Sequence, residues 1–281
     1  TGLVNAAGID FYSRLVDALL MHGIPPALTL YHWDLPQELQ DAGGWTNRDT
    51  ATRFADYATV VADALGDRVN FWTTMNEPWC AAFLGYAAGV HAPGHTSGAE
   101  TLSAVHHLLL GHGLAVRNLR SALPAGSQLA ITLNPAVPRP ATASGDDALA
   151  CSKVDGLQNR IWLEPLFRGQ YPSDVREFTA SVSDWSFVRD GDLPVIATPI
   201  DILGVNYYNP VVVAHYGGAG QRASSDGHGG GASPWVGAGD VQFLDPPGRH
   251  TAMGWPVDAS GLRELLGRLW REYGKPTLVT E

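Results

Sequence analysis

Runs of mostly apolar residues recur along the chain and have the length of β-strands. They are largely continuous rather than alternating between apolar and polar positions, which is typical of parallel strands buried on both faces. We therefore predict five strands, at Ala27–Tyr31, Val69–Thr74, Leu129–Leu133, Ile202–Tyr207 and Thr277–Thr280.

Helical patterns occupy the segments around and between these runs. A first helix ends near Gly23, and further helices are predicted at Asn47–Leu65, Thr101–Leu119, Ala148–Leu166 and Ala259–Tyr273. Strands that alternate with helices indicate an α/β fold with a parallel sheet. Such a sheet is either doubly wound or part of an eight-stranded barrel. A doubly wound nucleotide-binding protein should carry a glycine fingerprint after its first strand, and because none is present the barrel is favoured.

The longest irregular segment runs from His215 to Asp240 and is rich in glycine and serine, which predicts a mobile surface loop. It contains HGGG at His228–Gly231, a sequence found in the oxyanion loop of some esterases. The chain has no G-x-S-x-G nucleophile motif, so we interpret this similarity as accidental.

Composition narrows the possible partners. Of the 281 residues, 45% are hydrophobic and 16% are charged, so a large core can form, and the net charge of −10 argues against nucleic acid or an anionic membrane as partner. The two cysteines, Cys80 and Cys151, are interpreted as reduced thiols. The first residues do not resemble a signal peptide, which predicts a cytoplasmic protein, with secretion left open because the native N-terminus is expected to lie upstream.

Polar residues follow four of the five predicted strands, and in an α/β barrel such positions face the active site. They are His32, Trp33 and Asp34 after the first strand, Asn76 and Glu77 after the second, Asn206, Tyr207 and Tyr208 at the end of the fourth, and Glu281 after the fifth. The third strand ends in Asn134 and Pro135, which are interpreted as simple turn residues.

Two carboxylic acids, neutral hydrogen-bonding groups and indoles together suit hydrolysis of a glycosidic bond. Taken alone, Glu77 would be a solvated strand end and His32 a structural histidine; their occurrence at successive strand ends favours catalysis. The spacing of His106, His107 and His112 does not place all three on one helical face, so they are interpreted as ordinary helix residues. No metal-binding motif or phosphate loop is found, and no metal or other cofactor is expected.

Five long motifs resemble the β-glucosidases of glycoside hydrolase family 1. They are LTLYHWDLPQELQDAGGWTNRDT, FWTTMNEPW, ILGVNYY, MGWPVDASGL and KPTLVTE, and the resemblance extends over essentially the whole sequence. It implies a (β/α)8 TIM barrel of which about strands 3 to 7 are present, as a single catalytic domain over residues 1–281 that is truncated at both ends. It also implies retaining hydrolysis of terminal β-D-glucosides.

The matching motifs also imply roles for individual residues. Glu77 would be the general acid/base, Glu281 the nucleophile, and Tyr208 a hydrogen-bond donor to the nucleophile. The substrate-binding candidates are His32, Trp33 and Asn76 for the sugar, Asn206 at the end of the fourth strand, and Trp79, Trp255 and His91 on the aglycone side. The partner would be a small β-glucoside or an oligosaccharide.

Family members normally have two further strands before this region and an eighth strand after it. Their absence predicts an internal piece of a longer chain that does not form a competent barrel alone. It also leaves open a 6-phospho-β-glucosidase, although no phosphate-binding residues are visible. Three further alternatives are an endo-glucanase of a related barrel family, a sugar-binding module without catalysis, and a catalytically incompetent fragment. The YHWDLP and VNYY segments argue against the first, and the presence of both carboxylates argues against the second.

Overall fold

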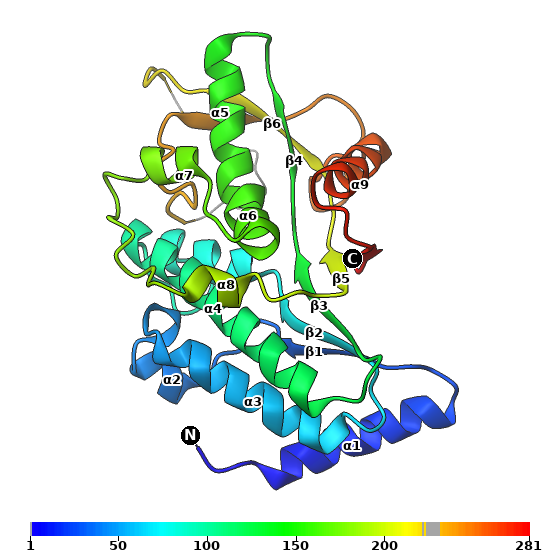
Figure 1. Cartoon of the computed structure of the whole chain (residues 1–281). Coiled ribbons are helices and arrows are strands. Elements are labelled where there is room, and N and C mark those ends of the chain that lie inside the picture. Colours follow the sequence, from blue (N-terminus) through cyan, green and yellow to red (C-terminus); the bar gives the residue numbers. More distant parts are fainter. Residues whose placement is uncertain (1, 221, 223–230) are drawn as a thin grey trace.

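The computed structural model describes residues 2–220, 222 and 231–281, and its main feature is a sheet of five parallel strands (Figure 1). The strands lie side by side in the order in which they occur along the chain. They are β1 (Ala27–Tyr31), β2 (Phe71–Asn76), β3 (Gln128–Leu133), β5 (Ile202–Val205) and β8 (Thr277–Val279). Sequential order is expected of a section of an α/β barrel, whereas the strand order of a doubly wound sheet reverses at its switch point.

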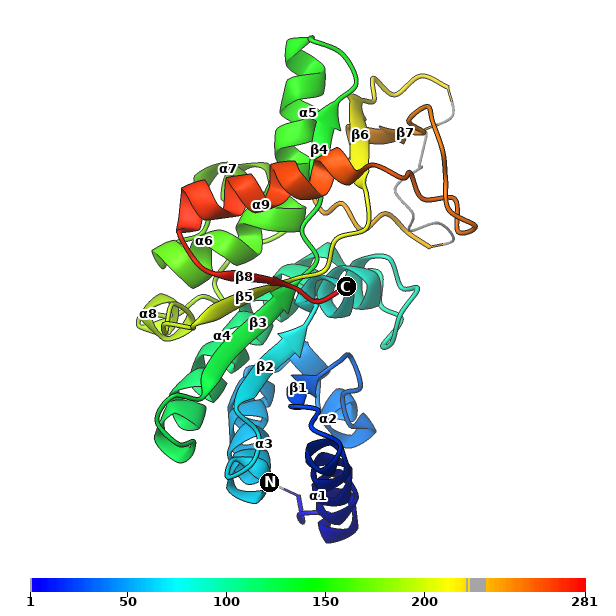
Figure 2. The ribbon, with the colours of Figure 1, turned by 90° about the vertical axis from the view of Figure 1, so that its right-hand side faces the viewer.

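The predicted strands are confirmed with small shifts of their ends, and the core forms where helices cover the middle of the sheet. The longest helices are α3 (Asp49–Leu65) and α4 (Gly98–Ala122), which pack against each other and lie along one face of the sheet in both views (Figures 1 and 2). In β3 every residue after Gln128 is buried, and so is every residue of β2 after Phe71. This burial explains why both strands are continuous apolar runs.

Capping residues fix where several helices begin. Ser97 precedes α4 and its hydroxyl accepts a hydrogen bond from the amide of Glu100, and Asp258 caps α9 (Ala259–Tyr273) through the amide of Ser260. These bonds satisfy amides that have no partner within the helix. Helix α9 ends at Gly274, which has a φ of 61°, a backbone conformation that favours glycine. The predicted bounds of α9 are confirmed.

The helix predicted at Ala148–Leu166 is confirmed as helical throughout, but the structure extends it at both ends and interrupts it with a π-helical turn. It consists of α5 (Gly145–Asp155), the π-helical turn η3 (Gly156–Arg160) and α6 (Ile161–Arg168). The turn begins at Gly156, where a side-chain carbon would come within 2.8 Å of Val175. The widened turn directs Gln158 and Asn159 toward the segment that follows β3, where they bond to the backbone of Asn134 and Ala136.

A second, smaller sheet was not predicted from the sequence. It contains β4 (Val137–Pro140), β6 (Pro210–His215) and β7 (Val241–Leu244), in the order β4–β6–β7, with α5 packed against it (Figure 1). Proline usually argues against a strand, but Pro138 and Pro140 lie on an edge strand, where a missing amide is tolerated. The predicted loop therefore begins with His215 still in β6. Residues 228–230 of the HGGG sequence lie outside the described residues.

The remaining short helices connect these elements. They are α2 (Gln37–Asp41), the 3-10 turn η1 (Gly44–Thr46), the π-helical segment η2 (Cys80–Ala87), α7 (Ser173–Phe178) and α8 (Asp192–Ile196). Among the described residues, no helix combines the length and the apolar character that a bilayer span requires.

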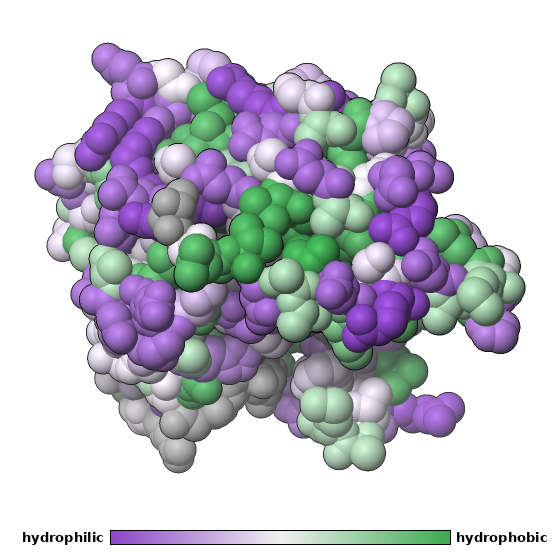
Figure 3. Space-filling model, turned by 90° about the horizontal axis from the view of Figure 1, so that it is seen from below, coloured by the Kyte–Doolittle hydropathy of each residue, from purple (hydrophilic) through white to green (hydrophobic). Residues whose placement is uncertain are grey.

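Apolar side chains are exposed beside the first and the last strand of the five-stranded sheet. The helix α1 (Ala6–Met21) buries only Val16, and β8 leaves Leu278 and Val279 partly open. Figure 3 views the end of the molecule at which α1 lies in Figure 1, and hydrophobic residues form a band across it. Exposed apolar residues of this N-terminal region include Leu3, Val4, Phe11, Leu15, Met21 and Ile24. Within the described residues, β1 and β8 are the outer strands of this sheet, and each pairs with one strand only.

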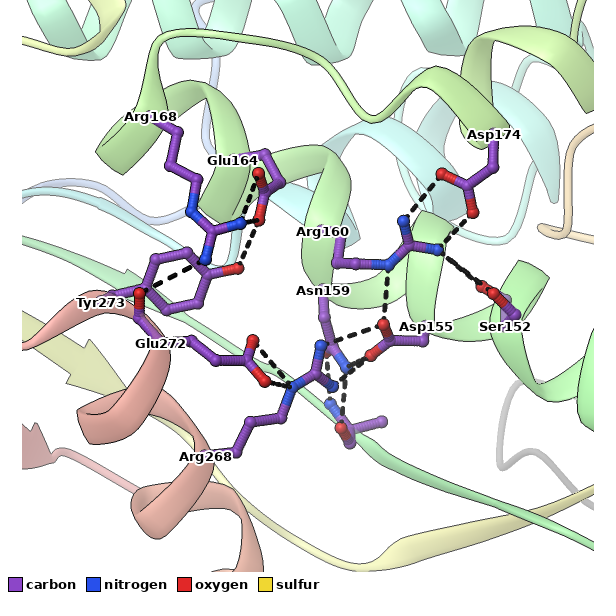
Figure 4. A network of polar contacts seen from close by, with 11 residues as sticks. Ser152, Asp155, Asn159, Arg160, Glu164, Arg168, Asp174, Arg268, Glu272 and Tyr273 are labelled. Atoms are coloured by element: carbon purple, nitrogen blue, oxygen red, sulfur yellow. Dashed lines mark hydrogen bonds and ion pairs between the residues drawn. The ribbon is translucent and has the colours of Figure 1, made fainter.

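A polar network joins α9 to the interrupted helix formed by α5, η3 and α6 (Figure 4). The carboxylate of Asp155, at the end of α5, accepts hydrogen bonds from Arg160 in η3, from Arg268 in α9 and from Asn159. Burial acts to raise the pKa of Asp155, but its bonds to Arg268 and the nearby positive charges outweigh burial and hold the pKa below its usual value. The ionised carboxylate therefore stabilises the contact between the two helices.

We predict that Asp155→Asn lowers the free energy of unfolding by about 2 kcal/mol, because it leaves two partly buried guanidinium groups without their shared counter-charge. Since the folded pKa is depressed, this difference should be present above the unfolded pKa of about 3.9 and disappear as the pH falls through the folded value. Urea unfolding at several pH values measures it. Asp146→Asn, an exposed position at the start of α5, is the control. Equal effects of the two substitutions would contradict the role of the network.

Candidate active site

The carboxyl ends of β2, β5 and β8 bring together the residues predicted to carry the chemistry. Glu77 directly follows β2, Tyr208 lies three residues after β5, and Glu281 lies two residues after β8. The backbone carbonyl of Glu281 accepts a hydrogen bond from the amide of Tyr207 at 3.1 Å, which fixes the end of the chain against the segment after β5. In Figure 2 the C-terminus lies beside these strand ends. Three parallel strands thus deliver their polar residues to one place.

Glu77 is held in a fixed position where the chain turns from strand to helix. Its φ is 44°, a conformation that a residue with a side chain rarely adopts. Its amide donates to the carbonyl of Thr132 in β3 at 2.9 Å, and its own carbonyl accepts from the amide of Cys80. The residue is 4% exposed, and its Oε1 accepts a hydrogen bond of 2.6 Å from the Nδ2 of Asn206. The backbone and a buried amide therefore orient this carboxylate together.

The hydroxyl of Tyr208 connects the two glutamates. It lies 2.5 Å from the Oε2 of Glu281 and 3.3 Å from the Oε1 of Glu77. Because both oxygens lie within hydrogen-bond distance of one atom, they are no more than about 6 Å apart. Burial, the hydrogen bond to Glu281 and the charge of Glu77 raise the pKa of Tyr208 far above its usual value, so the phenol keeps its proton and acts as a donor.

Asn206 was predicted to bind substrate, but the structure places it beneath the site. It is 0% exposed, and its Nδ2 donates to the Oδ1 of Asn76 as well as to Glu77. Its Oδ1 accepts a hydrogen bond of 2.6 Å from the hydroxyl of Thr280. Both polar atoms of the amide are thus occupied. Asn206 positions its neighbours instead of contacting a ligand, and the sequence-based role is corrected accordingly.

His32, Trp33 and Asn76 form a group beside Glu77. The Nε2 of His32 lies 3.3 Å from the Nδ2 of Asn76, and the indole Nε1 of Trp33 donates to the carbonyl of Asn76 at 2.9 Å. Trp33 has a φ of 79°, a strained conformation that fixes the direction of its ring. The ring of His91 lies 5.2 Å from that of Trp33. Four of the predicted substrate-binding side chains are therefore neighbours in space.

The two other predicted tryptophans have different surroundings. The ring of Trp255 lies 5.1 Å from the ring of Tyr208, the residue whose hydroxyl bonds to Glu281. Trp79 is only 1% exposed and is stacked on Phe83 in the core, with Trp235 nearby. In the described part of the chain this ring therefore lies in the core, and its predicted contact with an aglycone stays a prediction.

Sequence reasoning missed Thr280, Cys80 and Asn134 at this site. The thiol of Cys80 donates to the Oε2 of Glu77 at 3.2 Å, and Asn134, interpreted above as a turn residue, donates to the Cys80 sulfur at 3.5 Å. Both cysteines, Cys80 and Cys151, are free in the structure. The one sequence signal for these residues was the position of Asn134 directly after β3. Turn residues also occupy such positions, so this signal alone did not identify Asn134 as part of the site.

The histidines of α4 are structural, as predicted. His106 bonds to Tyr171 and Asp192, His107 to the carbonyl of Trp45, and His112 to Thr74. Burial lowers the pKa of His107 to about 4 and that of His112 to about 3, so both rings are neutral near pH 7. Across the described residues there is no group of three or more His, Cys, Asp or Glu side chains that could hold a metal ion.

Comparison with known proteins relates this geometry to a family. The model of glycosyl hydrolase family 1 matches residues 1–281. A bifunctional β-D-glucosidase/β-D-fucosidase of Bifidobacterium breve is 46% identical over all of this chain and 60% of its own length, and the thermostable β-glucosidase B of Thermobispora bispora is 45% identical over all of this chain and 55% of its own length. The chain thus spans somewhat more than half the length of these curated relatives.

Solved structures agree. The crystal structure of a psychrophilic β-glucosidase from Micrococcus antarcticus superposes with a TM-score of 0.91 at 45% identity, covering 99% of this chain and 60% of that one. The β-glucosidase of Thermotoga maritima, solved in complex with deoxynojirimycin, gives a TM-score of 0.88 at 36% identity, covering 100% of this chain and 59% of that one. The fold is therefore a part of a TIM barrel, and the chain belongs to glycosyl hydrolase family 1.

Proposed function

We propose that this chain carries the catalytic centre of a retaining β-glucosidase that works by double displacement with Glu77 and Glu281. The observation that supports this most is the Tyr208 hydroxyl, which lies within hydrogen-bond distance of both carboxylates. Retaining glycosidases hold their two carboxyl groups about 5–5.5 Å apart, whereas inverting enzymes need about 6.5–9.5 Å to admit a water molecule. A separation of the nearest oxygens that cannot exceed about 6 Å favours the retaining arrangement.

In the proposed first step, the ionised Glu281 attacks the anomeric carbon while Glu77 transfers its proton to the departing glycosidic oxygen. Tyr208 donates its hydrogen bond to the attacking carboxylate and holds it in one orientation. Once the glycosyl ester has formed, Glu281 no longer carries a negative charge. Glu77, now ionised, takes a proton from water, which attacks the same carbon and releases the sugar.

The substrate proposed is a small β-glucoside or an oligosaccharide with a terminal β-D-glucosyl unit. His32 and Asn76 offer hydrogen-bonding groups for sugar hydroxyls next to Glu77, and the indole of Trp33 offers an apolar face. Trp255 and His91 are proposed to contact the aglycone, because the ring of His91 lies beside Trp33 and the ring of Trp255 lies beside Tyr208. The names of the relatives support the choice of glucose. We also propose a cytoplasmic location, in keeping with two free thiols.

We predict that Glu77→Gln, in the protein with all the sequence its gene encodes, lowers kcat/KM for alkyl glucosides by about 100- to 10,000-fold. Dinitrophenyl glucoside should still transfer its sugar to the enzyme, because that leaving group departs without a proton. Added azide should then accelerate turnover and give a β-glucosyl azide. Glu177→Gln, an exposed glutamate on α7, is the matched control. Similar losses on both substrates, with no azide product, would remove Glu77 from the acid/base role.

We further predict that Glu281 forms the covalent intermediate. A 2-deoxy-2-fluoro-β-glucoside with a good leaving group should trap a glycosyl ester, because the fluorine destabilises the cationic transition states of formation and breakdown. Mass spectrometry of the digested protein should locate the sugar on Glu281, and Glu281→Ala should abolish labelling. A sugar mapped to another residue would overturn this assignment.

A further inference from the structure

The two oxygens of the Glu77 carboxylate have different partners. Oε1 receives the amide of Asn206 and lies near the hydroxyl of Tyr208, so it is on the side of Glu281. Oε2 is turned to the sulfur of Cys80, 3.2 Å away. A carboxyl group held at both oxygens cannot rotate freely about its last carbon–carbon bond, so its plane is fixed.

Cys80 is itself held in place. It begins η2, its amide donates to the carbonyl of Glu77 at 2.9 Å, and the residue is 5% exposed. The Nδ2 of Asn134 donates to the sulfur at 3.5 Å, and the carbonyl of Asn134 accepts from Gln158 in η3 at 2.8 Å. The sulfur thus accepts from Asn134 and donates its own hydrogen to Glu77.

The thiol is in the form that can donate. Burial, followed by the charge of Glu77, raises the pKa of Cys80 well above its usual value. The protonated thiol is therefore favoured over a nucleophilic thiolate. The thiol can then donate one weak S–H hydrogen bond, which goes to the Oε2 of Glu77.

We infer that Cys80 is a positioning residue for general acid/base catalysis, in which its S–H group, supported by Asn134 and Gln158, fixes the plane of the Glu77 carboxyl. This inference rests on the proposed function of Glu77. Without the thiol, Oε2 would lose this donor, and the carboxyl could turn away from Glu281. Misorientation of this kind slows only those steps that need proton transfer.

The test uses the full-length protein that the gene encodes. It compares variants with and without a hydrogen-bond donor at position 80 on a series of aryl glucosides whose leaving groups differ in acidity. Cys80→Ala should lower kcat/KM by about tenfold for the poorest leaving groups and by less than about twofold for dinitrophenyl glucoside. Cys80→Ser, which keeps a donor, should restore the rates to within about threefold of the parent. Cys151→Ala removes the other thiol, on α5, and is the control.

Cys80→Val fills the space without a donor and must behave as Cys80→Ala does; it also serves if the alanine variant does not fold. Equal losses on all leaving groups, no loss at all, or no recovery in Cys80→Ser would each overturn the inference. Glu77→Gln is measured alongside. If it shows the leaving-group dependence and the donor-free variants do not, only the role of Cys80 fails; if Glu77→Gln lacks that dependence, the proposed function fails as well.

Discussion

The buried amide of Asn206 is the point on which the site depends. It bonds to Asn76 and Glu77 at the end of β2 and to Thr280 after β8, while Asn206 itself directly follows β5. A buried amide with all these bonds made is costly to displace, because each broken bond would leave a polar atom unsatisfied away from water. One side chain thus connects the ends of three strands. The Tyr208 hydroxyl, two residues further along, then reaches both glutamates.

Much of the fold could be predicted from the sequence, where the local pattern and the tertiary environment agree. The apolar run at Ala27–Tyr31 and the amphipathic pattern at Ala259–Tyr273 have the bounds that the structure shows. The π-helical turn that begins at Gly156 could not be seen, because the close approach of Val175 at this glycine comes from another helix. Strand β4 was hidden by Pro138 and Pro140, whose missing amides are tolerated only because the strand lies at an edge.

At the site, too, some features could be predicted from the sequence and others could not. Glu77, Tyr208 and Glu281 were found because parallel strands align their carboxyl ends, so position after a strand predicts proximity. That rule does not separate a residue that faces a ligand from one that lies beneath it. Asn206 and Trp79 occupy such buried places, and only packing reveals it. Cys80 and Asn134 were missed for a related reason. Cys80 begins η2 and Asn134 follows β3, and the contact between them is seen only in the folded chain.

Double displacement requires the two carboxylates to be close enough for one to act as nucleophile while the other transfers protons. Product stereochemistry tests this most directly. Proton NMR recorded during the first seconds of β-glucoside hydrolysis, before the anomers equilibrate, identifies the anomer that is released. We expect β-glucose first, as two successive displacements at one carbon require. Release of α-glucose first would indicate direct attack by water, and would contradict both the assignment of Glu281 as nucleophile and the role of Tyr208 as its hydrogen-bond donor.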